Sequence, residues 1–227
     1  MDFQEYQSII VDDIESCLEG MGVQPILFFG SGMSQRYIDT PTWNGLLEIL
    51  ANQCPNIDKN IAYYQQKHNS PIAISSEFAE YIREWAWNEE DLFPSDLFEP
   101  NKPADIYIKH IVSEIFRGID SSPEAESKLT LYSKELESLK AINPYSIITT
   151  NYDGLLERFF ENYTPIIGQE ILRVNYASVG EIIKIHGCSS IPESIVLTQK
   201  DYDHFSAKKK YLSAKLLTYW VHLHKGT

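Results

Sequence analysis

Cysteine is scarce in this chain, and the few cysteines present are widely separated. Only Cys17, Cys54 and Cys188 occur among the 227 residues. An odd number without a Cys-x-x-C pair fits neither a disulfide framework nor a four-cysteine zinc module. We therefore expect a reduced protein that carries no structural metal.

Basic charge is also in short supply. The chain has 19 lysines and arginines against 32 acidic residues, which gives a net charge of −13. A surface of this sign repels nucleic acid and anionic membranes. The densest basic run, Lys208–Lys210, fits the solvated side of a helix. We expect no direct contact with nucleic acid.

Long apolar runs and a basic leader are missing as well. No stretch is apolar for long enough to span a bilayer. The first residues, Met1 to Glu5, lack the basic flank of a signal peptide. The hydrophobic content of 43% is that of an ordinary globular protein. These features predict a cytoplasmic protein without a membrane partner.

The chain is organised around one segment in which an apolar run enters a small-residue turn. Ile26–Phe29 predicts a buried central strand, and Gly30 to Ser34 form the turn after it. A helix follows from Trp43, with Thr42 as its N-cap. Glycines at such a turn let backbone N–H groups approach a phosphate. A plain strand-to-helix connection is the alternative interpretation.

Two further regions complete the predicted fold. Residues 52–140 have helical periodicity and predict a helical insertion, whereas 21–51 and 141–227 predict an α/β core. The later elements are expected as strands at Tyr145–Thr149, Ile171–Val174, Glu181–Ile185 and Ser194–Leu197 and helices at Gly154–Phe160 and Gln199–Leu223. The fold class is therefore α/β, with a Rossmann-like parallel sheet and helices on both faces, in a single domain spanning 1–227.

Polar clusters stand at the ends of two of these strands. Thr149 to Asp153 follow one strand, and His186 and Gly187 follow another. Ligands of open α/β sheets bind at the carboxyl ends of strands, so we expect both clusters to meet the Gly30 turn. His186 can act as a base, and Asn151 can hold a water or a ribose hydroxyl. Singly, Asn151 or Asp153 could also be an N-cap, and His186 a hydrogen-bonded turn residue.

Three segments together resemble, in order, the signature segments of sirtuins. These segments are Gly30-Ser31-Gly32-Met33-Ser34, Thr149-Thr150-Asn151-Tyr152-Asp153 and Lys184-Ile185-His186-Gly187. The family counterparts are the Gly-Ala-Gly-x-Ser turn, the Thr-Gln-Asn-x-Asp loop and the His-Gly pair. The variants Ser31, Thr150 and Tyr152 look most similar to the sirtuin-like domains of bacterial anti-phage defence systems. The resemblance extends from about Gln24 to the C-terminus.

The resemblance implies an NAD+ glycohydrolase (NADase) that cleaves the nicotinamide–ribose bond as the effector of an abortive-infection defence. It assigns Asn151 and His186 as catalytic residues. It assigns NAD contacts to Gly30, Ser31, Gly32, Ser34, Thr150, Asp153 and Gly187. NAD is then a substrate, and no metal is expected. A silent effector also implies a homo-oligomer or a regulatory partner, for example an ATPase or a phage-sensing subunit.

The chain departs from the family pattern in two places. The four-cysteine zinc module of the protein-deacetylating members is absent from the sequence, which argues for NAD hydrolysis over deacetylation. The Gly-rich strand that usually follows Trp220 is also absent, so we expect the C-terminal end of the fold to be truncated or completed by another chain. Two alternatives therefore stay open: a catalytically silent NAD or ADP-ribose sensor, and an NAD-dependent deacylase or ADP-ribosyltransferase.

Overall fold

A parallel β-sheet forms the centre of the core. The computed structural model describes residues 2–21, 24–168 and 180–205. Its four strands are β1 (Ile26–Phe29), β2 (Ser146–Thr149), β3 (Thr164–Ile167) and β4 (Glu181–Lys184), in the order β1-β2-β4-β3. The register pairs Phe29 with Thr149 and Thr149 with Lys184. Because these pairs are the last residues of their strands, three carboxyl ends lie side by side.

Two short helices cover one face of this sheet. Helix α2 (Ser31–Ile38) follows β1 directly, and α9 (Leu155–Phe159) follows β2. Ile147 and Ile182 point to this face and pack with Leu156 and Phe160 of the α9 region. Ile148 and Ile183 point to the other face, as the period of two along a strand requires.

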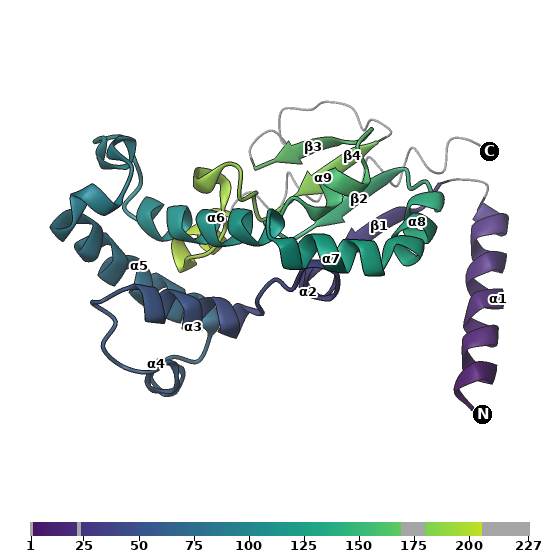
Figure 1. Ribbon diagram of the computed structural model, residues 1–227, viewed down its shortest axis with the longest axis horizontal. Helices are drawn as coiled ribbons and strands as arrows, with labels where there is room; N and C mark the ends of the chain where they lie inside the picture. The colour runs from purple at the N-terminus through teal and green to yellow at the C-terminus, as the bar shows by residue number, and fades with distance from the viewer. Residues whose placement is uncertain (1, 22–23, 169–179, 206–227) are drawn as a thin grey trace.

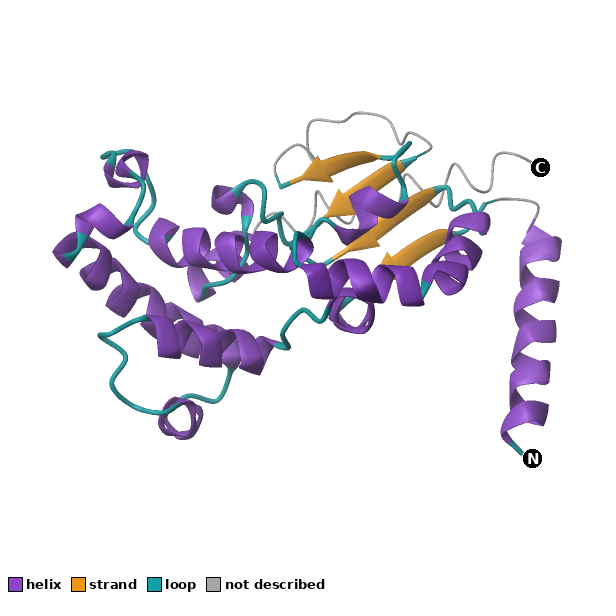
Figure 2. Ribbon diagram, viewed as in Figure 1, coloured by secondary structure: helices purple, strands orange, loops and turns teal. Residues whose placement is uncertain are grey.

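A second group of helices extends the covered side. Helices α7 (Pro123–Leu131) and α8 (Ser133–Ala141) contribute Ala125 and Leu136 to a cluster with Tyr37 and Ile38 of α2. Figure 2 shows α7 and α9 in front of the strands. The sequence is therefore correct in predicting an α/β fold with a Rossmann-like parallel sheet.

The largest apolar cluster belongs to helices beside the sheet. It unites α3 (Trp43–Gln53), α4 (Ile61–Lys67), α5 (Pro71–Asn88) and α6 (Ile106–Asp120), and Figure 1 shows this group to one side of the strands. Tyr152, Ile195 and Leu197 from the core are buried in the same cluster. The two parts of the chain therefore share apolar contacts next to the strand ends. The domain limits at 52 and 140 stay predictions.

The predicted start of one of these helices is confirmed. Thr42 Oγ1 accepts a hydrogen bond of 3.1 Å from the Gly45 N–H, so the predicted N-cap of α3 is confirmed. Helices α7 and α8 follow each other directly and meet at Tyr132. The acidic segment after α5 forms two short 3₁₀ helices, Glu90–Leu92 and Ser95–Phe98.

Helix α1 (Phe3–Met21) stands apart from the other elements in Figure 1. The apolar spacing of Ile10 and Ile14 is typical of a helix. Its exposed apolar side chains are those of Phe3, Tyr6, Ile9, Ile10, Val11 and Ile14. Within the described ranges, no other element covers this stripe, and α1 takes no part in the site below.

The strand predictions are wrong at three points. In the described part of the chain β1 is an edge strand, and Phe28 is 63% exposed, so the central position expected for β1 is not observed. Strand β3 was not predicted. It contains Pro165, which lacks an N–H group, and an edge strand such as β3 tolerates proline. The expected strand at Ser194–Leu197 is irregular, because Ile195 and Leu197 bury their side chains among helices. The expected strand at Ile171–Val174 lies outside the described residues.

The described helices place no segment across a bilayer. None of them is long and apolar enough to cross a membrane.

Candidate active site

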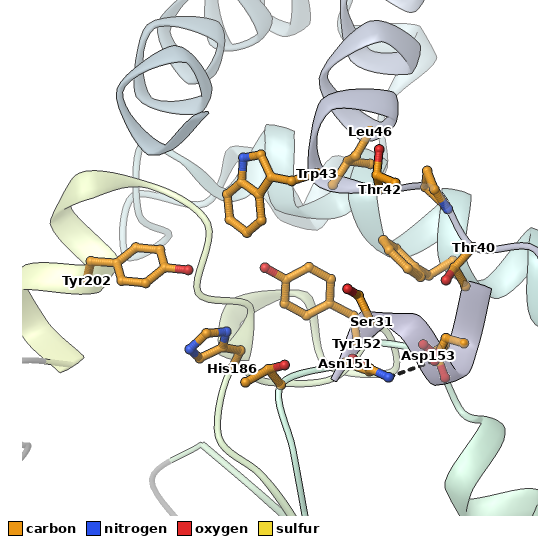
Figure 3. Close-up of a pocket in the computed structure, with 14 residues that line it drawn as sticks. Ser31, Thr40, Thr42, Trp43, Leu46, Asn151, Tyr152, Asp153, His186 and Tyr202 are labelled. Atoms are coloured by element: carbon orange, nitrogen blue, oxygen red, sulfur yellow. Dashed lines mark hydrogen bonds between the residues drawn. The ribbon is translucent and has the colours of Figure 1, made fainter. Parts of the chain in front are cut away.

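The aligned ends of β1, β2 and β4 open onto one cavity. It has a volume of about 240 Å³ and lies between the strand ends and the α3–α6 helices (Figure 3). The residues that line it are Ser31, Ser34, Thr40, Pro41, Thr42, Trp43, Leu46, Phe116, Thr150, Asn151, Tyr152, Asp153, His186 and Tyr202. The sequence placed its polar clusters at these strand ends, and the fold brings six of the nine predicted site residues onto this one cavity.

Helix α2 begins immediately after β1, which differs from the extended glycine turn that was expected. Gly30 is the N-cap with a φ of −108°, and neither Gly30 nor Gly32 has a positive φ. Their conformations are therefore open to any residue. A Cβ added at either glycine would meet nothing within 4 Å. The two glycines therefore leave open space around the start of α2.

The start of α2 is suited to an anion. Gly30 has no side chain that could cap the first turn of α2. Among the described residues, no cap side chain therefore bonds to the backbone N–H groups of that turn. The positive end of the helix dipole adds to them. Ser31 of this first turn lines the cavity. The arrangement is therefore the one that binds phosphates in other α/β proteins.

Asn151 is held rigidly by its amide nitrogen. Nδ2 donates to the Gly30 carbonyl oxygen at 2.9 Å and to Ser34 Oγ at 2.7 Å, the second of which is dashed in Figure 3. A carbonyl oxygen accepts only, so this bond fixes which end of the amide is the nitrogen. Both amide hydrogens are thereby used, and Oδ1 is left to accept from a ligand or a water in the cavity.

Asp153 bonds to the start of α9 and also lines the cavity. Its Oδ1 accepts from the Leu155 N–H at 3.2 Å at the start of α9, whereas its buried Oδ2 has no hydrogen-bond partner among the described residues. Burial raises the pKa of this carboxyl, and the positive charge of Lys184 opposes that rise. Gly154 is the N-cap of α9, so the N-cap alternative for Asn151 or Asp153 is wrong, although Asp153 Oδ1 accepts from the first N–H group of that helix.

His186 is a neutral imidazole in an aromatic setting. Its ring lies edge-on to Tyr202 and Phe205, with centroids 5.6 and 5.7 Å away. Desolvation by this burial lowers the pKa of His186 below its usual 6.5. No side chain of the described residues hydrogen-bonds to the ring, so the alternative of a hydrogen-bonded turn residue applies only to its backbone carbonyl, which accepts from the Val196 N–H at 3.0 Å.

Gly187 shapes the turn behind His186 and does not line the cavity. Its φ is +88°, and an added Cβ would lie 2.2 Å from the Ser194 carbonyl oxygen. Only glycine fits there. Of the predicted ligand contacts, Ser31, Ser34, Thr150 and Asp153 line the cavity, whereas Gly30, Gly32 and Gly187 are backbone positions beside it.

Sequence reasoning missed the walls of the cavity. Trp43 and Leu46 come from α3, Phe116 from α6, and Tyr202 from the segment after residue 198 (Figure 3). The apolar spacing of Trp43, Leu46 and Phe116 signals helix cores equally well, so periodicity cannot assign them to a ligand site. Proximity of Trp43 to the Gly30 turn in sequence is the one usable signal.

In the residues that the structure describes, no group of three or more histidine, cysteine, aspartate or glutamate side chains is arranged to hold a metal ion. Cys54 and Cys188 are buried free thiols.

Comparison with known proteins gives one family. Residues 145–222, about a third of the chain, match the model of the SIR2-like domain. The matched range contains β2, the Asn151–Asp153 turn, β4 and His186. A search of the curated proteins gives no match. SIR2-like domains use NAD, so the match supports a sirtuin-like domain with an NAD-related function.

Proposed function

We propose that this protein hydrolyses NAD+ at the nicotinamide–ribose bond and releases nicotinamide and ADP-ribose. The observation that carries the proposal is the meeting of Asn151, Asp153 and His186 on one cavity beside the start of α2. An anion site, a fixed amide oxygen and a neutral imidazole are the groups that this reaction needs.

Each group has a step in the reaction. The bond from ribose C1′ to nicotinamide breaks with its electron pair on nicotinamide, and a water forms the new bond to C1′ and loses a proton. Asn151 Oδ1 holds the water or a ribose hydroxyl by accepting a hydrogen bond. His186 Nε2 or Nδ1 accepts a proton from a ribose hydroxyl as general base. The ribose oxygen then takes the proton that the attacking water loses, and His186 releases its proton to solvent.

Charge in the site favours the same step. Bond cleavage builds positive charge on the ribose, and fixed negative groups near that position stabilise it. Asp153 is a candidate, because it lines the cavity and its buried Oδ2 has no hydrogen-bond partner in the described ranges. The carboxamide of nicotinamide can also donate a hydrogen bond to the Asp153 carboxylate.

The size of the cavity limits what it holds. Small-molecule pockets usually measure roughly 300–1,000 Å³. The cavity of about 240 Å³ therefore fits the nicotinamide and its ribose, with the pyrophosphate at the start of α2. A module that binds NAD or ADP-ribose in this cavity without turnover is the second candidate.

Product analysis tests the function. The purified chain is incubated with NAD+, and the products are separated by chromatography. Equal amounts of nicotinamide and ADP-ribose support hydrolysis. Saturable binding without product supports the silent module. Transfer of radiolabelled ADP-ribose or of an acyl group from an added acylated peptide supports a transferase or deacylase.

The biological setting is a further part of the proposal. The variants at Ser31, Thr150 and Tyr152 support an effector of anti-phage defence that depletes NAD when triggered. Such an effector needs control by a homo-oligomer or by a regulatory subunit. NAD levels after phage infection, in cells carrying the intact gene or a His186→Ala variant, test this role. A fall in NAD that is equal in both strains would contradict it.

The acidic limb of the pH profile should lie below pH 6.5. Protonated His186 cannot accept a proton, and burial lowers the pKa at which protonation occurs. Activity should therefore persist from pH 7 down past the usual histidine pKa of 6.5. Tyr202→Ser exposes the ring to water, so its limb should move up toward pH 6.5. A measured kcat/KM limb at or above pH 7 in the unmodified protein would contradict this assignment.

A further inference from the structure

The Asn151–Asp153 turn rests on a buried lysine that the proposed mechanism does not use. Lys184 is the last residue of β4, two residues before His186, and its side chain is 0% exposed. It is paired in register with Thr149, the last residue of β2. Its side chain therefore starts beside the strand end from which the turn departs.

The three hydrogens of the Lys184 ammonium group are all used. Nζ donates to the carbonyl oxygen of Asp153, to that of Tyr152 at 3.5 Å and to Glu157 Oε1 at 2.7 Å. The Tyr152 carbonyl also accepts from the Ser189 N–H at 2.8 Å. The Asp153 carbonyl has no second partner in the described part of the chain, so Lys184 alone satisfies it.

Three acidic side chains at or near the turn also bear on the role of Lys184. Asp120, Asp153 and Glu157 each have one buried carboxylate oxygen without a hydrogen-bond partner in the described ranges. Asp120 also accepts from the Gly154 N–H at 2.8 Å, which follows the turn. Lys184 is thus the cation that the turn and its carboxylates share, and a buried charge in such a place is costly unless it is fully bonded.

We propose that Lys184 is a positioning residue of the site. Its hydrogen bonds to the Tyr152 and Asp153 carbonyl oxygens fix the turn, and the fixed turn orients the side chains of Asn151 and Asp153 into the cavity. The alternative is a structural ion pair in which Lys184 only neutralises Glu157. The two differ in which bond matters, the bond to Glu157 or the bonds to the turn. The catalytic part of this inference rests on the proposed NAD hydrolysis.

A matched pair of variants separates them. Lys184→Met and Glu157→Gln both remove the ion pair, but only Lys184→Met also removes the donors to the turn. A misplacement of about 1 Å in a catalytic group costs up to about 100-fold in rate. Lys184→Met should therefore lower kcat about 10- to 100-fold with KM for NAD within about threefold. Glu157→Gln should keep kcat within about threefold.

Hydrogen exchange gives a readout that needs no turnover. The amides of Asn151, Gly154 and Leu155 are bonded within or beside the turn. Their exchange should be faster in Lys184→Met and unchanged in Glu157→Gln. If the intact protein cleaves no NAD, the proposed function fails, and this exchange comparison still decides the role of Lys184.

Two results would overturn the inference. One is an equal loss of kcat in both variants, or equal exchange at the turn, because the ion pair would then carry the effect. The other is a Lys184→Met protein with unchanged exchange and kcat. If Lys184→Met does not fold, Lys184→Arg takes its place. Arginine keeps a positive charge beside Glu157, but its larger guanidinium cannot occupy the position of the ammonium group. We therefore expect kcat of Lys184→Arg to fall about 10-fold. Normal kcat in Lys184→Arg would likewise overturn the inference.

Discussion

Replacing Asn151 by alanine is expected to lower kcat for NAD cleavage about 100- to 1,000-fold, the usual effect of removing one fixed polar group from a catalytic site. The two bonds from its Nδ2 hold Oδ1 facing the cavity, so no other side chain can take over that position. The measurement is the steady-state rate of nicotinamide release with NAD at saturation.

Ser34→Ala is the matched control for this prediction. It removes one of the two Asn151 bonds and leaves the bond to the Gly30 carbonyl. Each lost bond costs about 1 kcal/mol of stability, so Asn151→Ala, which loses both bonds, should melt at a slightly lower temperature than Ser34→Ala, which loses one. The control should lose no more than about 10-fold in kcat. An Asn151→Ala protein with kcat within threefold of the unmodified protein would contradict the assignment of Asn151.

Gly187→Ala is expected to have the largest effect on stability, a loss of about 2–4 kcal/mol in the free energy of unfolding. The added Cβ would overlap the Ser194 carbonyl oxygen, and alanine rarely adopts a φ of +88°. The turn that carries His186 must then move. Urea unfolding followed by circular dichroism measures the loss.

Gly32→Ala provides the comparison for that measurement. Gly32 lies within α2, and a Cβ there meets nothing within 4 Å. Alanine is the better helix former, so this variant should match the unmodified protein or exceed its stability by up to about 1 kcal/mol. An equal urea midpoint for Gly187→Ala and Gly32→Ala would show that the turn does not require glycine.

The sequence predicts the parts of the fold in which local pattern and burial agree. β1 is an apolar run, β2 and β4 are short runs built around two isoleucines, and the predicted bounds of all three are correct to within one residue. Polar residues directly after these runs then had to meet, because parallel strands end at one edge. The position of the cavity follows from that rule.

Other features depend on contacts that no local pattern encodes. Pro165 is atypical of a strand, and β3 tolerates this proline only because β3 lies at the edge of the sheet. Val196 sits in an apolar run typical of a strand, yet its neighbours are buried against helices. The burial of Lys184 was also unforeseen, because a lysine is rarely buried unless it is paired. The assigned roles of the site residues, the domain limits and the partners stay predictions.

The most direct test of the central claim compares the intact protein with its His186→Ala variant in two measurements on the same samples. ADP-ribose affinity is measured by calorimetry, and nicotinamide release from NAD by chromatography. The account predicts similar ADP-ribose affinity in both proteins, with release at least about 100-fold slower in the variant. Equal release from the two proteins would contradict the account.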